Sequence, residues 1–221
     1  MQVSGGLTVT RPNPTWVYHF TRVEHLATIR THGLCCDRRA KNDGMLSLEV
    51  GNKEIKSRRA GRSVPVMPGG VVADYTPFYF APRSPMMFSI HKGNVQGYDG
   101  GADRLIYLAT TVERLVALGL DVVLTDRNAV LEYASFARLS DGEPDASFID
   151  WALMEQRMWN NTEDKPDRME RRMAECLVHE SVPWEGFQAV VAKSRSVADE
   201  VADLLGAERR PDLAVRRDWY F

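Results

Sequence analysis

Short apolar runs of strand length set the hydrophobic pattern of the chain. Runs rich in β-branched and aromatic residues, bounded by glycine, proline or polar residues, predict strands at 15–20, 74–87, 104–111, 121–126, 174–179 and 187–193, with a basic strand ending in "RRDWYF". Helical spacing predicts helices at 21–32, at 53–62, after residue 110, near 147–159 and from Ser196. Strands and helices mix without a regular βαβ alternation, so the pattern favours an α+β fold over a doubly wound sheet.

Local capping signals set the expected helix ends. Thr21 and Glu24 have the spacing of a capping box for the first helix, and Gly33 supplies its stop. The same reasoning caps the third helix with Thr110 and Glu113, which Gly119 ends, and the last with Ser196 and Asp199. Residues 34–52 are irregular and polar and predict no element.

Length and composition predict one folded domain. The chain has 221 residues, of which 44% are apolar and 26% charged, ordinary values for a globular protein with a core. Residues 1–14, with Gly5, Gly6, Pro12 and Pro14, resemble a loose lead-in, and 15–221 shows no internal boundary or repeat. We therefore expect a lead-in at 1–14 and a single domain at 15–221.

Charge, cysteines and histidines narrow the function classes. A formal charge of −2 excludes strong global attraction to nucleic acid but allows a local basic face. No run approaches the roughly 20 apolar residues of a membrane span, and no secretory signal is evident. The odd cysteine count fits no disulfide framework, which favours a reduced, cytoplasmic protein. The five histidines lie scattered outside zinc-ligand spacings, so we expect no metal.

The common nucleotide and hydrolase motifs are missing, and polar residues on or beside apolar strands are what remains. The sequence has no P-loop, no Rossmann fingerprint and no G-x-S-x-G elbow. Taken singly, each remaining residue has a simpler structural interpretation as a packing, core, strand-end or solvated side chain. The set is His19, Arg58, Arg59, Tyr79, Arg83 and Glu175.

The order of several short motifs favours a functional interpretation of these residues over the structural one. "YHFT", "EIKSRR", "DYTPFYFAPRSPMM", "RRMAECLV" and a terminal "DWYF" follow one another from about Tyr18 to Phe221. This series resembles the DarT family, the DNA ADP-ribosyltransferase toxins of bacterial toxin–antitoxin pairs. The resemblance implies an ADP-ribosyltransferase-like fold, with a central split β-sheet flanked by helices.

The resemblance also implies an NAD⁺ site and roles for the residues in it. Glu175 stands at the catalytic glutamate of the family and Arg59 at its catalytic arginine, with Arg58 as the alternative. NAD⁺ loses nicotinamide through a cationic, oxocarbenium-like ribose, and a base nitrogen needs a proton acceptor before it can attack. The expected NAD⁺-binding residues are His19, Thr21, Arg58, Tyr79, Arg83 and Met86.

Two basic segments predict where DNA would lie. "KEIKSRRAGR" carries five positive charges and one negative, and "KPDRMERR", just before Glu175, carries four and two. In ADP-ribosyltransferases the loop that leads to the catalytic glutamate usually shapes the acceptor site, so the resemblance implies that residues 157–172 form the substrate loop. Its expected DNA contacts are Arg157, Trp159, Arg168, Arg171 and Arg172. Trp159 and Tyr98 are candidates to stack on unpaired bases, the alternative for Trp159 being that it completes the apolar face of its helix.

The function that the resemblance implies is ADP-ribosylation of a base in single-stranded DNA. Thymidine is the favoured acceptor and guanosine the other one left open. NAD⁺ would be a co-substrate and no metal would be needed. The implied partner is a DarG-like macrodomain antitoxin, and a monomer is favoured. The rival hypotheses are a transferase with a protein, RNA or small-molecule acceptor, and a silent module that binds NAD⁺ or single strands.

Overall fold

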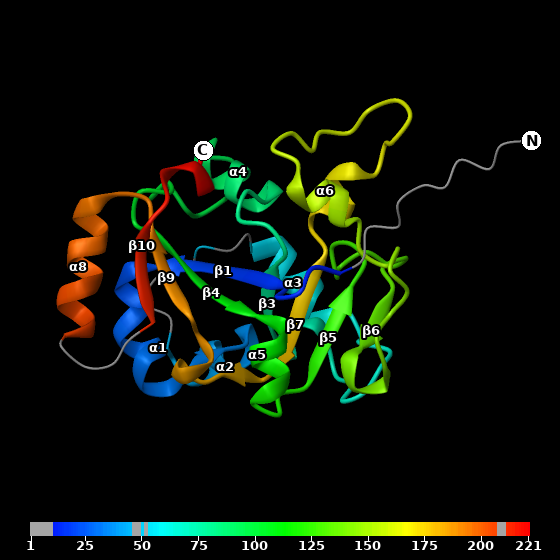
Figure 1. Cartoon of the computed structure of the whole chain (residues 1–221), viewed down its shortest axis with the longest axis horizontal. Helices are drawn as coiled ribbons and strands as arrows, with labels where there is room; N and C mark the ends of the chain where they lie inside the picture. Colours follow the sequence, from blue (N-terminus) through cyan, green and yellow to red (C-terminus); the bar gives the residue numbers. More distant parts are fainter. Residues whose placement is uncertain (1–10, 46–49, 51–52, 207–210) are drawn as a thin grey trace, which may run out of the picture.

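A mixed eight-stranded sheet is the centre of the fold. The computed structural model describes residues 11–45, 50, 53–206 and 211–221. In this part of the chain the strand order is β10-β9-β4-β1-β3-β7-β5-β6, and only β9 and β10 pair in parallel (Figure 1). The strands are β1 (Trp16–Arg22), β3 (Tyr75–Tyr79), β4 (Leu105–Thr111), β5 (Val122–Thr125), β6 (Phe136–Arg138), β7 (Glu175–His179), β9 (Ala189–Ala192) and β10 (Asp212–Val215). A separate two-stranded ribbon joins β2 (Leu34–Cys35) to β8 (Ser181–Val182).

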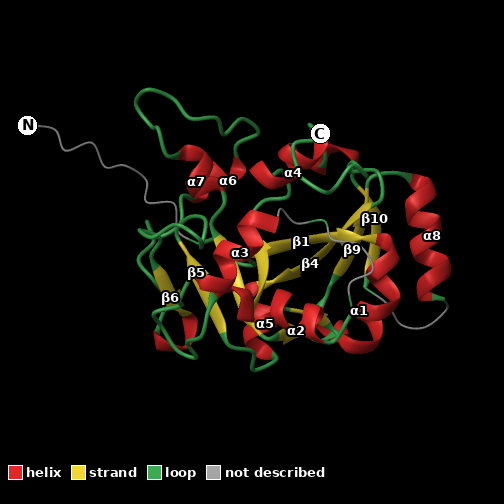
Figure 2. Ribbon diagram, turned by 180° about the vertical axis from the view of Figure 1, so that it is seen from behind, coloured by secondary structure: helices red, strands yellow, loops and turns green. Residues whose placement is uncertain are grey.

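Helices flank this sheet. They are α1 (Leu26–His32), α2 (Asp37–Asn42), α3 (Lys53–Gly61), α4 (Pro85–His91), α5 (Val112–Ala117), α6 (Trp151–Glu155), α7 (Arg168–Arg172) and α8 (Arg195–Leu205). Single 3₁₀ turns occupy Val23–His25, Val72–Asp74, Leu139–Asp141, Trp184–Gly186 and Arg217–Trp219. Both views place α8 along the β10 edge, and Figure 2 shows α6 beside α7 (Figures 1 and 2).

The sheet is split between β1 and β3. The β1–β4 ladder runs from the pair Trp16–Thr111 to Arg22–Leu105, and the β3–β7 ladder from Tyr75–His179 to Tyr79–Glu175. β1 and β3 share only the register pair Tyr18–Tyr79. The two halves diverge beyond this pair, which leaves room for a cavity there. The predicted α+β class, with a split central sheet flanked by helices, is confirmed.

Apolar burial explains why these segments form these elements. All seven residues of β4 are buried, which matches the continuous apolar run of a strand covered on both faces. In α8 the buried residues Val197, Val201 and Leu205 recur every four positions, so one stripe of the helix faces the core. The main cluster lies around Val17, Phe78 and their neighbours, and a second packs α4 against Tyr107 and Tyr220.

Strand pairing overrides the capping box expected at Thr21. β1 continues to Arg22, Thr21 pairs with Ile106, and its buried hydroxyl lies 3.0 Å from His25 Nδ1. The chain then enters α1 through the 3₁₀ turn Val23–His25 without a side-chain cap. The expected stop is confirmed, because Gly33 follows α1 with φ +78°.

Two further caps lie next to the expected ones. Thr111, not Thr110, accepts the capping hydrogen bond, from Arg114 N at 3.2 Å. Thr110 instead donates to Gly186 O at 2.6 Å and is buried in the β4 ladder. Ser194, not Ser196, caps α8 by accepting from Val197 N at 3.4 Å.

Several expected boundaries are wrong. The strand expected at 74–87 ends at Tyr79, because Pro85 and the Ser84 cap start α4. The helix expected near 147–159 is only Trp151–Glu155, capped by Asp150. The final strand stops at Val215, and "RRDWYF" continues as a 3₁₀ turn. Within the irregular segment 34–52, the described residues include β2 and α2.

Arg11 attaches the residues before β1 to the domain through Glu113 at 2.8 Å and Glu143 at 2.6 Å, whereas 1–10 lie outside the described residues. The three cysteines are free thiols. No helix in the described ranges is long and apolar enough to cross a membrane.

Candidate active site

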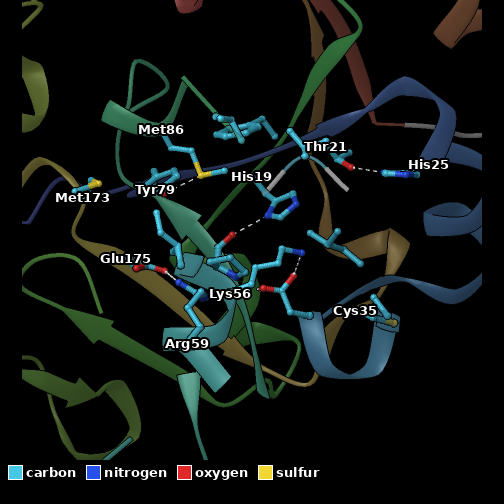
Figure 3. A pocket seen from close by; sticks show the side chains of 18 of the residues that line it. His19, Thr21, His25, Cys35, Lys56, Arg59, Tyr79, Met86, Met173 and Glu175 are labelled. Atoms are coloured by element: carbon cyan, nitrogen blue, oxygen red, sulfur yellow. Dashed lines mark hydrogen bonds and ion pairs between the residues drawn. The ribbon is translucent and has the colours of Figure 1, made fainter. Parts of the chain in front are cut away.

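A cavity of about 410 Å³ opens where the sheet splits. This volume falls in the usual range of small-molecule sites. Its wall combines β1, β3 and β7 with α2, α3 and α4, which bring together residues far apart in sequence (Figure 3). Among the predicted residues, the wall holds His19, Thr21, Arg59, Tyr79, Met86 and Glu175.

Glu175 and Arg59 form a buried ion pair at one end of this cavity. Glu175 opens β7 opposite Tyr79, and its Oε2 accepts a hydrogen bond from Arg59 Nη1 at 2.8 Å. Its Oε1 accepts from the backbone N–H of Ala129 at 3.1 Å. The two side chains are 2% and 9% exposed, so both oxygens of the carboxylate are fixed by protein donors.

Helix α3 decides between the two neighbouring arginines. Successive residues on a helix point about 100° apart, so Arg58 and Arg59 cannot face the same way. Arg59 is buried against Glu175, whereas Arg58 is exposed and does not line the cavity. Burial alone would lower the Arg59 pKa, but Glu175 and Asp37 outweigh it and raise that pKa above its usual value.

His19 is held as a neutral ring. Its Nδ1 lies 2.8 Å from the carbonyl oxygen of Pro77, which can only accept, so Nδ1 carries the proton and Nε2 is left as an acceptor. Burial by the surrounding wall lowers the pKa of His19 to about 4, although the Pro77 carbonyl opposes this shift. At neutral pH the ring therefore offers the cavity an acceptor without a charge.

Tyr79 supplies a flat aromatic surface beside the ion pair. Its ring lies parallel to Phe20, with centroids 6.4 Å apart, and its hydroxyl approaches Met86 Sδ at 4.0 Å. Burial, reinforced by the negative charge of Glu175, raises the Tyr79 pKa well above its usual value. The phenol of Tyr79 is therefore protonated and uncharged at neutral pH.

The structure places Arg83 apart from this group. One guanidinium nitrogen donates to Tyr220 O, and the group lies over the Phe221 ring at 3.9 Å. Arg83 shares a shallow groove with Arg157 and Phe221, outside the cavity that holds His19. Its predicted contact with NAD⁺ has no counterpart in the cavity wall.

Three of the predicted DNA-contacting arginines bond within the protein. Arg172 is buried and donates to Leu153 O at 2.6 Å and Met154 O at 2.8 Å. Burial, with a smaller effect of Arg83, lowers the Arg172 pKa to about 10.

The other two fasten the ends of the predicted substrate loop. Arg171 pairs with Asp150 and Asp167, and Arg168 donates to Asn160 O at 2.9 Å. These arginines therefore fold the loop, whereas Arg157 is exposed.

The aromatic candidates for base stacking are packed against protein. Trp159 is 4% exposed and meets Phe88 and Phe221 edge to face, at 6.0 and 6.5 Å between centroids. Tyr98 is buried and donates to Gly101 O at 2.9 Å. For Trp159 this geometry favours the packing alternative.

Sequence reasoning missed several residues of the cavity wall. Lys56 Nζ lies 2.7 Å from Asp37 Oδ1, and Asp37 Oδ2 lies 4.0 Å from Arg59 Nε, so acidic and basic groups alternate up to Glu175 (Figure 3). Asp37 belongs to the segment that predicted no element. The turn after β5 was missed too, although its polar "TDRN" directly after an apolar strand was a usable signal.

No group of three or more His, Cys, Asp or Glu side chains is arranged to hold a metal ion within the described ranges.

Comparison with known proteins agrees with this geometry. The family model described as "ssDNA thymidine ADP-ribosyltransferase, DarT" matches residues 18–221. A DNA ADP-ribosyl transferase of Thermus sp. is 34% identical over 215 residues, covering 96% of this chain and 99% of the relative. One of Mycobacterium tuberculosis is 34% identical over 205 residues, covering 91% and 86%.

Solved structures give the same result. Thermus sp. 2.9 DarT in complex with ADP-ribosylated ssDNA has a TM-score of 0.87 at 32% identity, covering 96% of this chain and 99% of the other. The same protein in complex with NAD⁺ has a TM-score of 0.82 at 31% identity, covering 96% and 100%. The resemblance found in the sequence motifs is confirmed: this chain belongs to the DarT family of single-stranded-DNA ADP-ribosyltransferases.

Proposed function

We propose that this protein transfers ADP-ribose from NAD⁺ to a thymine base of single-stranded DNA. Family membership and the relatives solved with NAD⁺ and with ADP-ribosylated ssDNA support the substrates. The observation that carries the proposal is the buried Arg59–Glu175 pair at the end of a cavity that His19 and Tyr79 also line. A carboxylate and a cation held together beside a ligand-sized cavity are what this transfer needs.

The NAD⁺ side of the site is assigned to β1 and β3. The neutral His19 ring offers Nε2 to a hydroxyl or amide N–H of NAD⁺. The Tyr79 ring suits the cationic nicotinamide, because cations are attracted to aromatic faces. Thr21 and Met86 belong to the same wall.

The chemical step is assigned to Glu175 and Arg59. Glu175 takes the proton from thymine N3, and the freed electron pair of N3 bonds to C1 of the ribose next to nicotinamide. The bond from that carbon to the nicotinamide nitrogen breaks, and nicotinamide leaves with its electrons. Arg59, fixed 2.8 Å from Glu175, stabilises the negative charge that develops on the base. Removing such a group lowers catalytic rates by about 100- to 1,000-fold in comparable sites.

Mass spectrometry of oligonucleotides tests the proposal. Mixed-sequence single strands are incubated with the protein and NAD⁺, beside a Glu175→Gln control. One added ADP-ribose on thymine, absent from the control, is the expected result. An adduct on guanine would show that the acceptor base is guanine and not thymine. Consumed NAD⁺ with unmodified DNA would point to a protein, RNA or small-molecule acceptor, and intact NAD⁺ to the silent binding module.

The biological setting follows from the same assignment. We propose a monomeric toxin, formed by residues 15–221, that acts in the cytoplasm and is neutralised by a DarG-like macrodomain antitoxin. Membership of the DarT family supports the toxin role. Growth arrest on expression, relieved by a co-expressed macrodomain hydrolase and absent with Glu175→Gln, is the expected outcome. Arrest that persists in the Glu175→Gln variant would refute it.

A further inference from the structure

The turn between β5 and β6 brings an amide side chain into the wall of the cavity that also holds the Glu175 carboxylate. Asn128 lines the cavity together with Met169, Met173 and Glu175. The residue after it, Ala129, donates its backbone N–H to Glu175 Oε1 at 3.1 Å. Figure 3 shows Glu175 and Met173 at one end of the cavity, and His25 and Cys35 at the other. Asn128 therefore belongs to the end where the acceptor base has to meet Glu175.

The turn is fastened to β7 and α7, so the position of Asn128 is fixed. Thr125 Oγ1 accepts from Glu175 N at 3.0 Å and donates to Arg127 O at 2.7 Å. The backbone N–H of Asn128 donates to Glu170 O at 3.1 Å, and its carbonyl oxygen accepts from Leu131 N at 3.1 Å. Hydrogen bonds thus hold both the N–H and the carbonyl group of Asn128 in place.

Hydrogen bonds also fix which way the Asn128 amide points. Its Oδ1 accepts from the backbone N–H of Val130 at 3.2 Å, so the oxygen is turned to the protein. Its Nδ2 has Met173 Sδ as a partner, at 3.7 Å, and a thioether is a weak acceptor. The NH₂ group is thus left to donate to a better acceptor at this end of the cavity.

We infer that Asn128 is a specificity-determining residue, whose Nδ2 donates to a carbonyl oxygen of the acceptor base. This inference rests on the proposed function. Thymine N3 lies between two carbonyl groups, and both oxygens gain negative charge when N3 loses its proton. A donor held beside Glu175 binds such an oxygen more strongly as the proton leaves, which favours an N–H flanked by carbonyls. Cytosine and adenine have no proton on the corresponding ring nitrogen.

Thymine analogues and an Asn128 variant test this together. Asn128→Ser removes the NH₂ donor but keeps a short oxygen acceptor for Val130 N. The acceptors are oligonucleotides with a single thymine, 2-thiothymine or 4-thiothymine, because sulfur accepts hydrogen bonds poorly. We expect Asn128→Ser to transfer to thymine about 10- to 100-fold more slowly, the usual effect of losing a hydrogen bond to a charged group. We also expect the wild type to discriminate against one thio analogue more strongly than the variant does.

Two further measurements separate a base contact from a structural role. Hydrolysis of NAD⁺ without DNA should be equal in wild type and Asn128→Ser, because water has no carbonyl group to bind. Gln188→Ser removes an exposed amide outside the cavity and should leave both rates unchanged.

Three results would overturn the inference. In the first, Asn128→Ser transfers ADP-ribose to thymine at the wild-type rate. In the second, the wild type and the variant discriminate equally against the thio analogues. In the third, Asn128→Ser loses NAD⁺ hydrolysis to the same extent as transfer to thymine. A wild type that modifies no oligonucleotide would refute the proposed function as well. If the wild type modifies thymine and Asn128→Ser does so at the same rate, only this inference is refuted.

Discussion

At the scale of single residues, Arg59 and Glu175 form a buried ion pair and are also the proposed catalytic groups. Removing one partner of a buried ion pair leaves an uncompensated charge and costs about 3 to 5 kcal/mol. We expect Arg59→Ala to lower the free energy of unfolding by that amount, and Arg59→Ala with Glu175→Ala to lower it by less than the sum of the two single changes. Urea unfolding of the four proteins measures this.

The matched control for this pair is the adjacent residue. Arg58→Ala removes the same side chain from the exposed face of α3 and should change the unfolding free energy by no more than about 0.5 kcal/mol. Equal destabilisation by the two arginine changes would contradict the assignment of Arg59 as the partner of Glu175.

His19 gives a second residue-scale prediction, in its pH dependence. Its pKa is about 4 in the folded chain, against an ordinary histidine pKa of 6.5. Between these values the unfolded state binds more protons, so the stability that the neutral ring provides is complete above pH 6.5 and is lost as the pH falls towards 4. Titration of the His19 ring by NMR should show a midpoint near 4.

The control for this titration is His19→Gln, which removes the titrating group. Its unfolding free energy should fall less between pH 6.5 and 4 than that of the wild type. A wild-type midpoint near 6.5 would mean that the ring is solvated, and that NAD⁺ meets a partly charged His19 in mildly acidic solution.

The sequence predicts which residues meet in the cavity only where a motif or the turn of a helix determines their position. The motif "AECLV" pointed to Glu175 and "SRR" to one of two arginines, and the phase of α3 then selects the one that meets Glu175. Neither Asn128 nor Asp37 lies in one of these motifs, and the polar "TDRN" after β5 marks only the turn that holds Asn128. Their positions depend on tertiary contacts, with Glu170 and Lys56 respectively, that no local period encodes.

At the scale of elements, the sequence predicted which strands and helices exist better than where they end. Thr21 and Thr110 have the chemistry of caps, but both are drawn into the β1–β4 ladder, where backbone pairing and burial outweigh a single capping bond. The long helix expected near 147–159 shrinks to α6, since Arg172 binds the carbonyl groups where that helix ends. Tertiary contacts thus moved the boundaries of the predicted elements, and α2, α4 and β6 are elements that the pattern did not predict.

Two glycines that end helices give an element-scale prediction. Gly33 after α1 and Gly119 after α5 have φ of +78° and +73°, where a side chain costs about 1 to 2 kcal/mol. A Cβ at Gly33 would also lie 2.7 Å from Val182 O of β8, whereas one at Gly119 would meet nothing within 4 Å. Gly33→Ala should therefore destabilise the protein by at least about 1 kcal/mol more than Gly119→Ala.

Chemical denaturation of the two glycine variants measures this difference. Equal losses of unfolding free energy would show that β8 moves aside without cost, and that α1 is not fixed against the β2–β8 ribbon.

At the scale of the whole molecule, the site is a product of topology. β1 comes from the start of the chain and β7 from near its end, yet only β3 separates them in the sheet (Figure 1). The cavity lies where β1 and β3 diverge, so one half of the sheet supplies His19 and the other supplies Tyr79 and Glu175. Strand periodicity does not reveal that β1, β3 and β7 are neighbours in the sheet. The order of the motifs did, because it resembles that of a family with this fold.

A ligand that bridges the split should stabilise the entire fold. We expect NAD⁺ at 100 times its Kd to add about 2.7 kcal/mol to the free energy of unfolding. For a chain of 221 residues this raises Tm by roughly 5 to 11 °C. Thermal unfolding in the Glu175→Gln background, where we expect transfer to be blocked, measures the effect. Adding His19→Ala should remove most of the rise, and adding His32→Ala, an exposed histidine outside the cavity, should not.

Hydrogen exchange then shows whether the ligand joins the two halves of the sheet. If NAD⁺ spans the cavity, amide exchange should slow in β1 and in β3 and β7 alike, although β1 and β3 share only the pair Tyr18–Tyr79. Protection confined to β1 would mean that NAD⁺ does not reach Tyr79 and Glu175. In that case the rise in Tm would come from one half alone, and the ion pair would have to meet the ribose in a conformation different from this one.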